Sequence, residues 1–259
     1  MRVYLSAVRA LHIQGGFPDP LVGCNRIPLV IRGLRRSKSG SCNQKVPITL
    51  LVLYAIRSQL NLDMHNDIML WAACCVAFFG FLRASEFTVP PDGFSANKHL
   101  SLKDISVDKQ PVPDNFFVNL KFSKTDQFGK GASIVLARTD TNVCPVRALM
   151  SYLHACGPTP GPLFLLSDGT PLTKSKLNTH LQHVLKQCGW SGIFTLHSFR
   201  VGAATTAASL GFPSHLIQAL GRWTSDAYKV YIKLPQERLH LASKSLGTLT
   251  AFSQSQGLC

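Results

Sequence analysis

The sequence has 259 residues, of which 46% are hydrophobic and 15% are charged. This is enough for one substantial hydrophobic core, or for a large domain with a small one. The 27 lysines and arginines outnumber the 13 acidic residues and give a formal net charge of +14. That charge favours a polyanionic partner, most simply nucleic acid; a merely basic soluble protein or one that touches acidic membranes is the alternative.

Several classes of protein and site find no support in the sequence. Residues 1–16 lack the layout of a signal peptide, and the longest apolar run, 68–82, is too short for a confident membrane span, so we expect no membrane partner. The eight cysteines show neither CxxC spacing nor a zinc pattern, and we expect no metal or cofactor. Cys74 and Cys75 lie in the most apolar run, which is typical of buried free thiols in a reducing, intracellular compartment.

The first part of the chain predicts a small helical unit followed by a basic linker. Residues 1–14 and 27–34 have the apolar spacing of helices, and residues 32–45 are basic and rich in serine and glycine. A linker of this kind can follow a DNA backbone or can be a solvated hinge without a partner. We therefore expect a first domain over 1–45 and a second over 46–259, with these candidate DNA-binding residues in the linker: Arg35, Arg36 and Lys38.

The second domain begins with two predicted helices, over 48–60 and 67–87. The longer one is apolar nearly all round, so it should be central to the core, with Asn66 as its N-cap. Arg83 and Glu86 follow its uncharged run. A charged side chain at the end of a buried helix must find a partner or reach a cleft. Taken alone, these two residues fit an ordinary ion pair at a surface end.

The segment from 100 to 138 changes to a strand pattern. Strands are predicted over 102–107, 116–126 and 132–138, with a turn at 127–131, which makes a hairpin or a three-stranded antiparallel sheet. Lys121, Lys124 and Lys130 would lie near its tip. A basic tip can enter a DNA groove, although lysines also protect sheet edges from aggregation.

Helices are then predicted over 145–156 and from Thr173 or Ser175 to about 188, with a short strand in 163–172 between them. The stretch 195–233 follows, where His197 and Arg200 share one helical face. We expect a second short helix over 214–220, a third that carries Tyr228 and Tyr231, and a last one within 234–249. The fold class is therefore mainly α with a small antiparallel sheet (α+β).

These polar residues suit metal-free attack on a phosphodiester. Two guanidinium groups can bind the nonbridging oxygens of a phosphate and offset the charge of the transition state. A tyrosine can act as the nucleophile and a lysine can protonate the leaving 5′-oxygen. A histidine beside the phosphate can accept the tyrosine proton.

Four ordered motifs resemble those of the tyrosine recombinase (phage integrase) family. FLRASEF resembles its first-arginine motif, KFSKTDQFGKG its lysine-bearing hairpin, LHSFRVGAATTAASLG its His-x-x-Arg helix, and LGRWTSDAYKVYIK its nucleophile segment. The resemblance covers the chain after Pro47 and is closest to recombinases of eukaryotic mobile elements. It implies these catalytic residues: Arg83, Lys124, His197, Arg200, Trp223 and Tyr231.

The resemblance leaves two positions open. LGRW offers Arg222 where many family members have histidine, and Trp223, whose indole N–H can donate to a phosphate oxygen; we favour Trp223. Tyr228 competes with Tyr231 as the nucleophile, and we favour Tyr231 by motif position. Glu86 and Arg222 are expected to support the site, with Lys130 as an alternative to Lys124.

The implied function is DNA strand cleavage and rejoining, as in site-specific recombination or DNA integration, through a covalent 3′-phosphotyrosine. The implied partners are double-stranded DNA and further copies of the chain, as a tetramer on DNA, without a small-molecule substrate. The chain would be nuclear if eukaryotic and otherwise cytoplasmic. Residues 1–45 would correspond to only part of the family's helical (SAM-like) core-binding domain, so a decayed or domesticated DNA-binding protein is the alternative. A type IB topoisomerase ranks third.

Overall fold

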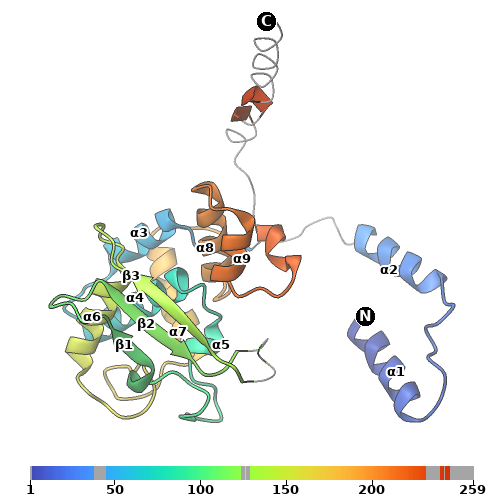
Figure 1. Cartoon of the computed structure of the whole chain (residues 1–259), viewed down its shortest axis with the longest axis horizontal. Coiled ribbons are helices and arrows are strands. Elements are labelled where there is room, and N and C mark those ends of the chain that lie inside the picture. The colour runs from blue at the N-terminus through green and yellow to red at the C-terminus, as the bar shows by residue number, and fades with distance from the viewer. Residues whose placement is uncertain are drawn as a thin grey trace, which may run out of the picture. The chain divides into compact units, whose positions relative to one another are not determined.

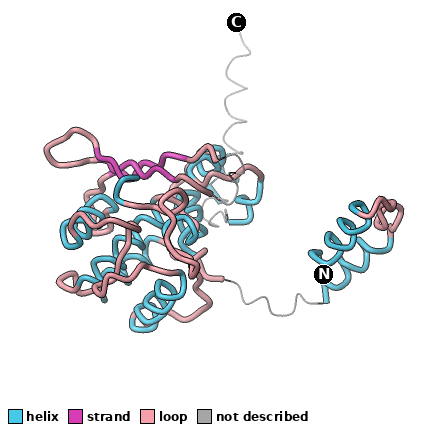
Figure 2. The backbone as a smooth tube through the Cα atoms, turned by 90° about the horizontal axis from the view of Figure 1, so that it is seen from below, coloured by secondary structure: helices cyan, strands magenta, loops and turns pink. Residues whose placement is uncertain are grey.

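The computed structural model describes residues 2–37, 45–123, 126, 129–231, 240–241 and 243–245. The chain divides into two compact units, 1–44 and 45–259. The first contains α1 (Arg2–Gln14) and α2 (Arg26–Ser37), which lie side by side (Figures 1 and 2). Leu5 and Ile31 line an apolar groove between the two helices, while Val3 and Leu11 are exposed. This unit buries little apolar surface of its own.

The core of the second unit is built around α4 (His65–Phe79). Every residue of α4 from Met69 to Phe78 is buried, which confirms the prediction of a central helix. It packs against α6 (Pro145–Cys156) and α8 (Ser198–Ser209), with α3 (Leu50–Gln59) and α7 (Lys174–Gln187) completing the helical body (Figure 1). The N-cap of α4 is Met64; the prediction of Asn66 was wrong, because its side chain accepts a hydrogen bond from the Ser167 N–H instead.

The prediction of one helix over 67–87 was also wrong, because the chain turns at Gly80 and Phe81. Phe81 has φ of +50°, its N–H donates to Phe78 O, and the Leu82 N–H donates to Ala77 O. These are the hydrogen bonds of a Schellman ending, which stops a helix by a left-handed residue. The short helix α5 (Ala84–Phe87) follows, with Arg83 as its N-cap. The turn leaves the carbonyl groups of Gly80 and Phe81 available to other parts of the chain.

A three-stranded antiparallel sheet lies against one side of the helical body (Figure 2). It consists of β1 (Ile105–Val107), preceded by the 3-10 helix η1 (Leu102–Asp104), then β2 (Asn115–Leu120) and β3 (Ala132–Ala137), in the order β1-β2-β3. Val118 stands opposite Ile105 on one side and Ile134 on the other. The predicted sheet is confirmed, but β2 ends at Leu120 rather than at Asp126. The Asp126 carboxylate accepts from the backbone N–H groups of Lys130 and Gly131, which forms a loop where a ladder was predicted.

The last described elements are α8, α9 (Ser214–Leu220) and the 3-10 helix η2 (Asp226–Tyr231). The predicted bounds of α9 are confirmed, as is Thr173 as the N-cap of α7. The strand predicted within 163–172 is instead an isolated bridge between Leu165 and Pro171. Residues 240–241 and 243–245 are helical, and the rest of the helix predicted within 234–249 lies outside the described residues.

Candidate active site

The start of α8 fixes the positions of His197 and Arg200. His197 is the N-cap residue, and the neighbouring Ser198 carbonyl accepts a hydrogen bond from the Ile48 N–H. Within the helix, a Cβ on Gly202 would lie 1.8 Å from Ile48 O. Since no other residue fits at that distance, Gly202 lets α8 pack directly on the backbone of the segment that begins at Lys45. His197 and Arg200 are thereby held at the edge of the helical core.

Tyr231 lies beside His197, at the end of η2. Its hydroxyl is 3.2 Å from His197 Nε2, and its carbonyl accepts from Thr205 Oγ1 of α8. Tyr228 is only 2% exposed and packs against Trp223, so its ring belongs to the core. Both tyrosine rings lie near Trp223, but Tyr231 is the one of the two that also contacts His197.

The surroundings of His197 favour its neutral form. Partial burial lowers the pKa of His197 below its usual value, and the positive charges of Arg200, Lys45 and Arg83 lower it further. A neutral imidazole has one ring nitrogen free to accept a proton. At neutral pH His197 Nε2 can therefore accept a hydrogen bond, and then a proton, from the Tyr231 hydroxyl.

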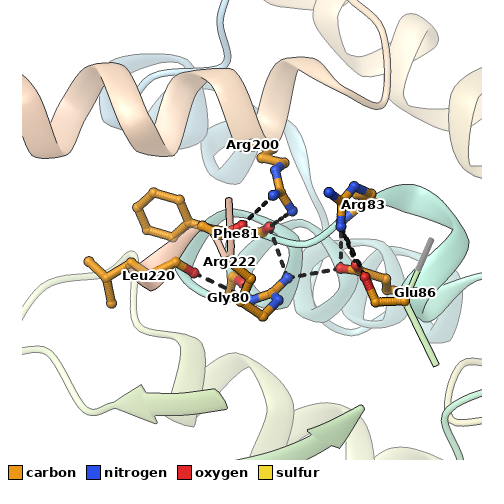
Figure 3. Close-up of polar contacts among 9 residues, drawn as sticks. Gly80, Phe81, Arg83, Glu86, Arg200, Leu220 and Arg222 are labelled. Atoms are coloured by element: carbon orange, nitrogen blue, oxygen red, sulfur yellow. Dashed lines mark hydrogen bonds and ion pairs between the residues drawn. The ribbon is translucent and has the colours of Figure 1, made fainter. Parts of the chain in front are cut away.

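Arg200 is almost completely buried, with 1% of its surface exposed. Its Nη1 donates to Phe81 O at 2.9 Å and its Nη2 donates to Gly221 O (Figure 3). The guanidinium carbon lies 4.4 Å from the centre of the Trp223 ring, within cation–π range. Burial, then repulsion from Arg83, lowers the pKa of Arg200 to about 10, so Arg200 is charged at neutral pH. A guanidinium has five N–H groups, and most of those on Arg200 have no acceptor among the described residues.

Arg83 is the N-cap residue of α5 and makes two hydrogen bonds to the Glu86 carboxylate. Its backbone N–H donates to Glu86 Oε2 at 2.9 Å, and its Nη1 donates to Glu86 Oε1 at 3.0 Å. Nη1 also lies 3.1 Å from Ser123 Oγ, so α5 meets the loop that follows β2. Lys124 lies outside the described residues. The structure thus brings Arg83 together with the residue that precedes Lys124.

Arg222 follows α9 and points toward the end of α4 (Figure 3). Its Nη2 is 2.9 Å from Glu86 Oε2, and its other contacts are with the carbonyls of Gly80, Phe81 and Leu220. Trp223 instead stacks on Arg200 and lies near the Tyr231 ring. The contacts with Gly80 and Phe81 were missed from the sequence, since backbone acceptors leave no side-chain signal.

We use the term arginine cluster for Arg83, Glu86, Arg200 and Arg222. Arg83 and Arg222 both pair with the Glu86 carboxylate, whose side chain is 1% exposed, whereas Arg200 donates to two backbone carbonyls. Excess positive charge that is partly buried is unfavourable unless an anion neutralises it. Among the described residues, the charge of the cluster therefore suits an anionic group, and His197 and Tyr231 stand next to it.

The structure describes only some of the other predicted DNA-binding residues. Lys121 Nζ pairs with the buried Asp104 carboxylate at 2.7 Å, and Lys130 is exposed on the loop before β3. Arg35 and Arg36 belong to α2, in the first unit, and Lys38 lies outside the described residues.

Within the described ranges, no helix is long and apolar enough to cross a membrane. The same residues contain no grouping of histidine, cysteine, aspartate or glutamate that could hold a metal ion. Cys74 and Cys75 are buried free thiols, and burial raises the pKa of both.

No known protein-family profile and no curated protein sequence matches the chain. Solved structures do match. XerA recombinase has a TM-score of 0.56 at 18% identity, over 78% of this chain and 65% of its own. XerH site-specific recombinase, bound to a palindromic difH substrate in a post-cleavage complex, has a TM-score of 0.56 at 16% identity, over 78% and 53%.

A lambda integrase dimer bound to a COC' core site has a TM-score of 0.55 at 16% identity, over 75% of this chain and 50% of that one. The matches agree with the mainly helical architecture and the small antiparallel sheet. The fold is that of the tyrosine recombinase catalytic domain. The chain spans between 50% and 65% of the length of these three proteins.

Proposed function

We propose that this chain cleaves and rejoins DNA strands, as in site-specific recombination or integration, through a covalent 3′-phosphotyrosine on Tyr231. The observation that carries the proposal is the contact between the Tyr231 hydroxyl and His197 Nε2, next to an arginine cluster that contains three guanidinium groups and one carboxylate. The formal net charge of +14 supports DNA as the source of that anion. The fold shared with XerA, XerH and lambda integrase supports this function by analogy.

In the proposed cleavage step, Arg83 and Arg200 bind the nonbridging oxygens of one phosphodiester. Tyr231 Oη attacks phosphorus as its proton passes to His197 Nε2. The bond between phosphorus and the 5′-oxygen breaks, and Lys124 supplies the proton that makes the leaving group a free 5′-hydroxyl. Because the new phosphotyrosine keeps the energy of the broken bond, attack by a 5′-hydroxyl can reverse the step and rejoin a strand.

We propose that the buried members of the cluster act mainly by charge. Arg200 is held by two backbone carbonyls and by the Trp223 ring, so it does not need to reorganise when the phosphate arrives. Preorganised donors in a site with little water stabilise developing charge more than mobile donors do. The proposed partner is double-stranded DNA, bound by several copies of the chain; lambda integrase forms a tetramer on a Holliday junction.

The test uses a nicked suicide DNA substrate. After cleavage, the short fragment that carries the new 5′-hydroxyl diffuses away, so the strand cannot be rejoined. Because the DNA target is unknown, the substrate is a pool of nicked duplexes with randomised sequence, and covalent protein–DNA adducts are recovered under denaturing conditions. We expect an adduct with the native chain, and none with Tyr231→Phe. Tyr228→Phe is the matched control and should retain the adduct.

Each outcome has a separate meaning. An adduct that survives in Tyr231→Phe but disappears in Tyr228→Phe would identify Tyr228 as the nucleophile instead of Tyr231. The absence of any adduct from the native chain, together with salt-sensitive DNA binding, would contradict the proposed cleavage and support a DNA-binding protein instead.

A further inference from the structure

Two helix ends with the same local geometry face each other in the arginine cluster. Phe81, two residues after the end of α4, has φ of +50°, and Arg222, two residues after the end of α9, has φ of +52°. In α9 the Arg222 N–H donates to Ala219 O and the Trp223 N–H donates to Gln218 O, the same pattern as at the end of α4. Glycine is the usual residue at this left-handed position of a Schellman ending. Here glycine stands one residue earlier, at Gly80 and at Gly221.

A side chain at such a position carries a cost. A residue other than glycine in the left-handed region loses about 1 kcal/mol or more. Phe81 offsets this by burying its ring, which is 6% exposed. Arg222 offsets it through polar contacts of its guanidinium, and these contacts identify its role.

The guanidinium of Arg222 is directed into the protein. Nη1 contacts Gly80 O at 3.0 Å and Leu220 O at 3.4 Å, whereas Nη2 contacts Phe81 O at 3.3 Å and Glu86 Oε2 at 2.9 Å (Figure 3). Nε is buried and has no acceptor among the described residues. Both terminal nitrogens are thus engaged with protein acceptors, and the third nitrogen is shielded from solvent.

Two of the four residues whose oxygen atoms Arg222 contacts, Glu86 and Phe81, also accept from another arginine of the cluster. Glu86 binds Arg83 through its other carboxylate oxygen, and Phe81 O accepts from Arg200 Nη1 at 2.9 Å. Arg222 therefore contacts the immediate partner of both Arg83 and Arg200. Removing the Arg222 side chain would remove one of the two arginines that bind the Glu86 carboxylate. It would also remove a contact to the Phe81 carbonyl, which accepts from Arg200.

We propose that Arg222 is a positioning residue that does not bind the phosphate itself. It acts through Glu86 and the Phe81 carbonyl, and so sets the distance between Arg83 and Arg200. This inference rests on the proposed function, in which those two arginines bind one phosphate. A lysine cannot replace it, because one ammonium cannot reach Glu86 and the carbonyls in a single plane.

The decisive variant is Arg222→Gly, which removes the side chain and also relieves the backbone strain. If Arg222 only ended the helix, Arg222→Gly would fold and cleave as well as the native chain. We expect the rate of adduct formation to fall by about 100-fold, since a displacement of about 1 Å in a positioning group costs that much. Arg222→Lys should recover only a small part of the rate.

Rescue of cleavage by added guanidinium ion distinguishes a positioning role from a purely structural one. At millimolar concentration it can occupy the space left in Arg222→Gly, between Glu86 and the carbonyls of Gly80 and Phe81, and we expect it to restore cleavage at least tenfold. The matched control is Arg147→Ala. Arg147 also donates to backbone carbonyls, those of Thr139 and Thr141, and its variant should show neither loss nor rescue.

A double variant separates positioning from direct contact with the phosphate. Because Arg222 acts through Glu86, adding Arg222→Gly to Glu86→Gln should slow cleavage by less than threefold beyond Glu86→Gln alone. If the two losses multiply, or if guanidinium fails to rescue, Arg222 acts in another way and the proposal is overturned.

Binding of inorganic phosphate tests the inference without cleavage. Phosphate should raise the melting temperature of the native chain, and Arg222→Gly should lose most of that rise. A full rise in Arg222→Gly would overturn the positioning role even if the native chain cleaves DNA. A native chain that forms no adduct, with the rise lost in Arg222→Gly, would instead contradict only the proposed cleavage.

Discussion

The arginine cluster and the His197–Tyr231 pair lie next to each other but are held in different ways. In the cluster, Arg200 and Glu86 are almost fully buried, and each has at least two polar contacts. Tyr231 and His197 are both more accessible to solvent than Arg200 and Glu86, and one contact of 3.2 Å joins their side chains. One half of the site is a fixed set of charges, and the other is a pair of groups with room to move.

This difference follows from what each half is proposed to do. Donors that stabilise charge are most effective when they need not reorganise, so burial among carbonyls and one carboxylate suits them. A nucleophile must approach phosphorus and later release it, which requires a side chain on an element that few contacts restrain. η2 satisfies that requirement: beyond the His197 contact, Tyr231 is joined to α8 through Thr205 Oγ1 and its own carbonyl.

The most damaging change should be Glu86→Gln, because it leaves the partly buried guanidinium groups of Arg83 and Arg222 without their carboxylate partner, next to the buried charge of Arg200. Removing one partner from a buried ion pair costs about 3–5 kcal/mol of unfolding free energy. We expect a loss in that range by urea denaturation, partly recovered by added sulfate.

The control for Glu86→Gln is Asp104→Asn, which removes a buried carboxylate that pairs with Lys121 and not with an arginine of the cluster. Sulfate should not recover the stability of Asp104→Asn more than that of the native chain. Equal recovery in both variants would mean that the cluster carries no special excess of charge.

The sequence predicted the members of the site better than the way in which they are held. The resemblance of FLRASEF, LHSFRVGAATTAASLG and LGRWTSDAYKVYIK to family motifs grouped Arg83, His197, Arg200 and Tyr231, and the structure places these four residues near one another. The turn at Gly80 was not predictable from periodicity, since the residues on both sides of it are as apolar as a continuous buried helix requires.

The turn at Gly80 matters because its backbone carbonyls accept hydrogen bonds from Arg200 and Arg222. Every residue has a carbonyl, so the sequence does not show which ones will bind an arginine. A sequence signal does exist in hindsight. Gly80 and Gly221 each stand two residues before an apolar side chain, Leu82 and Trp223, as is common at Schellman endings. Similarly, the alternation that extended β2 toward Asp126 gave no sign that this carboxylate would fold the loop.

An intermediate effect is expected at Trp223, the residue that contacts both halves of the site. Its ring lies 4.4 Å from the Arg200 guanidinium carbon, and its centroid is 6.2 Å from that of Tyr231. Trp223→Ala should lose about 2 kcal/mol of unfolding free energy, below the usual range for a fully buried tryptophan because the ring is only partly buried. Trp223→Phe, the matched variant, should lose less, since a ring still covers Arg200.

Gly221 provides an independent check on the Trp223 ring. A Cβ on Gly221 would lie 1.6 Å from Trp223 Cζ3, while the backbone conformation of Gly221 is one that alanine adopts freely. Gly221→Ala should therefore destabilise the native chain yet be tolerated in Trp223→Ala. Equal destabilisation in both backgrounds would show that the ring is not what Gly221 accommodates.

The smallest expected effect is the pH dependence of the His197–Tyr231 pair. Partial burial and the nearby arginines and Lys45 lower the pKa of His197, so the imidazole is neutral at pH 7 and becomes protonated only below its usual value of about 6.5. Protonation removes the acceptor for the Tyr231 proton, so adduct formation should be constant near neutral pH and fall tenfold per unit below the lowered pKa. The measurement is the single-turnover rate between pH 5 and pH 8. His197→Gln should be slower throughout and lack this acid limb, whereas an acid limb that persists in His197→Gln would assign the titration to another group.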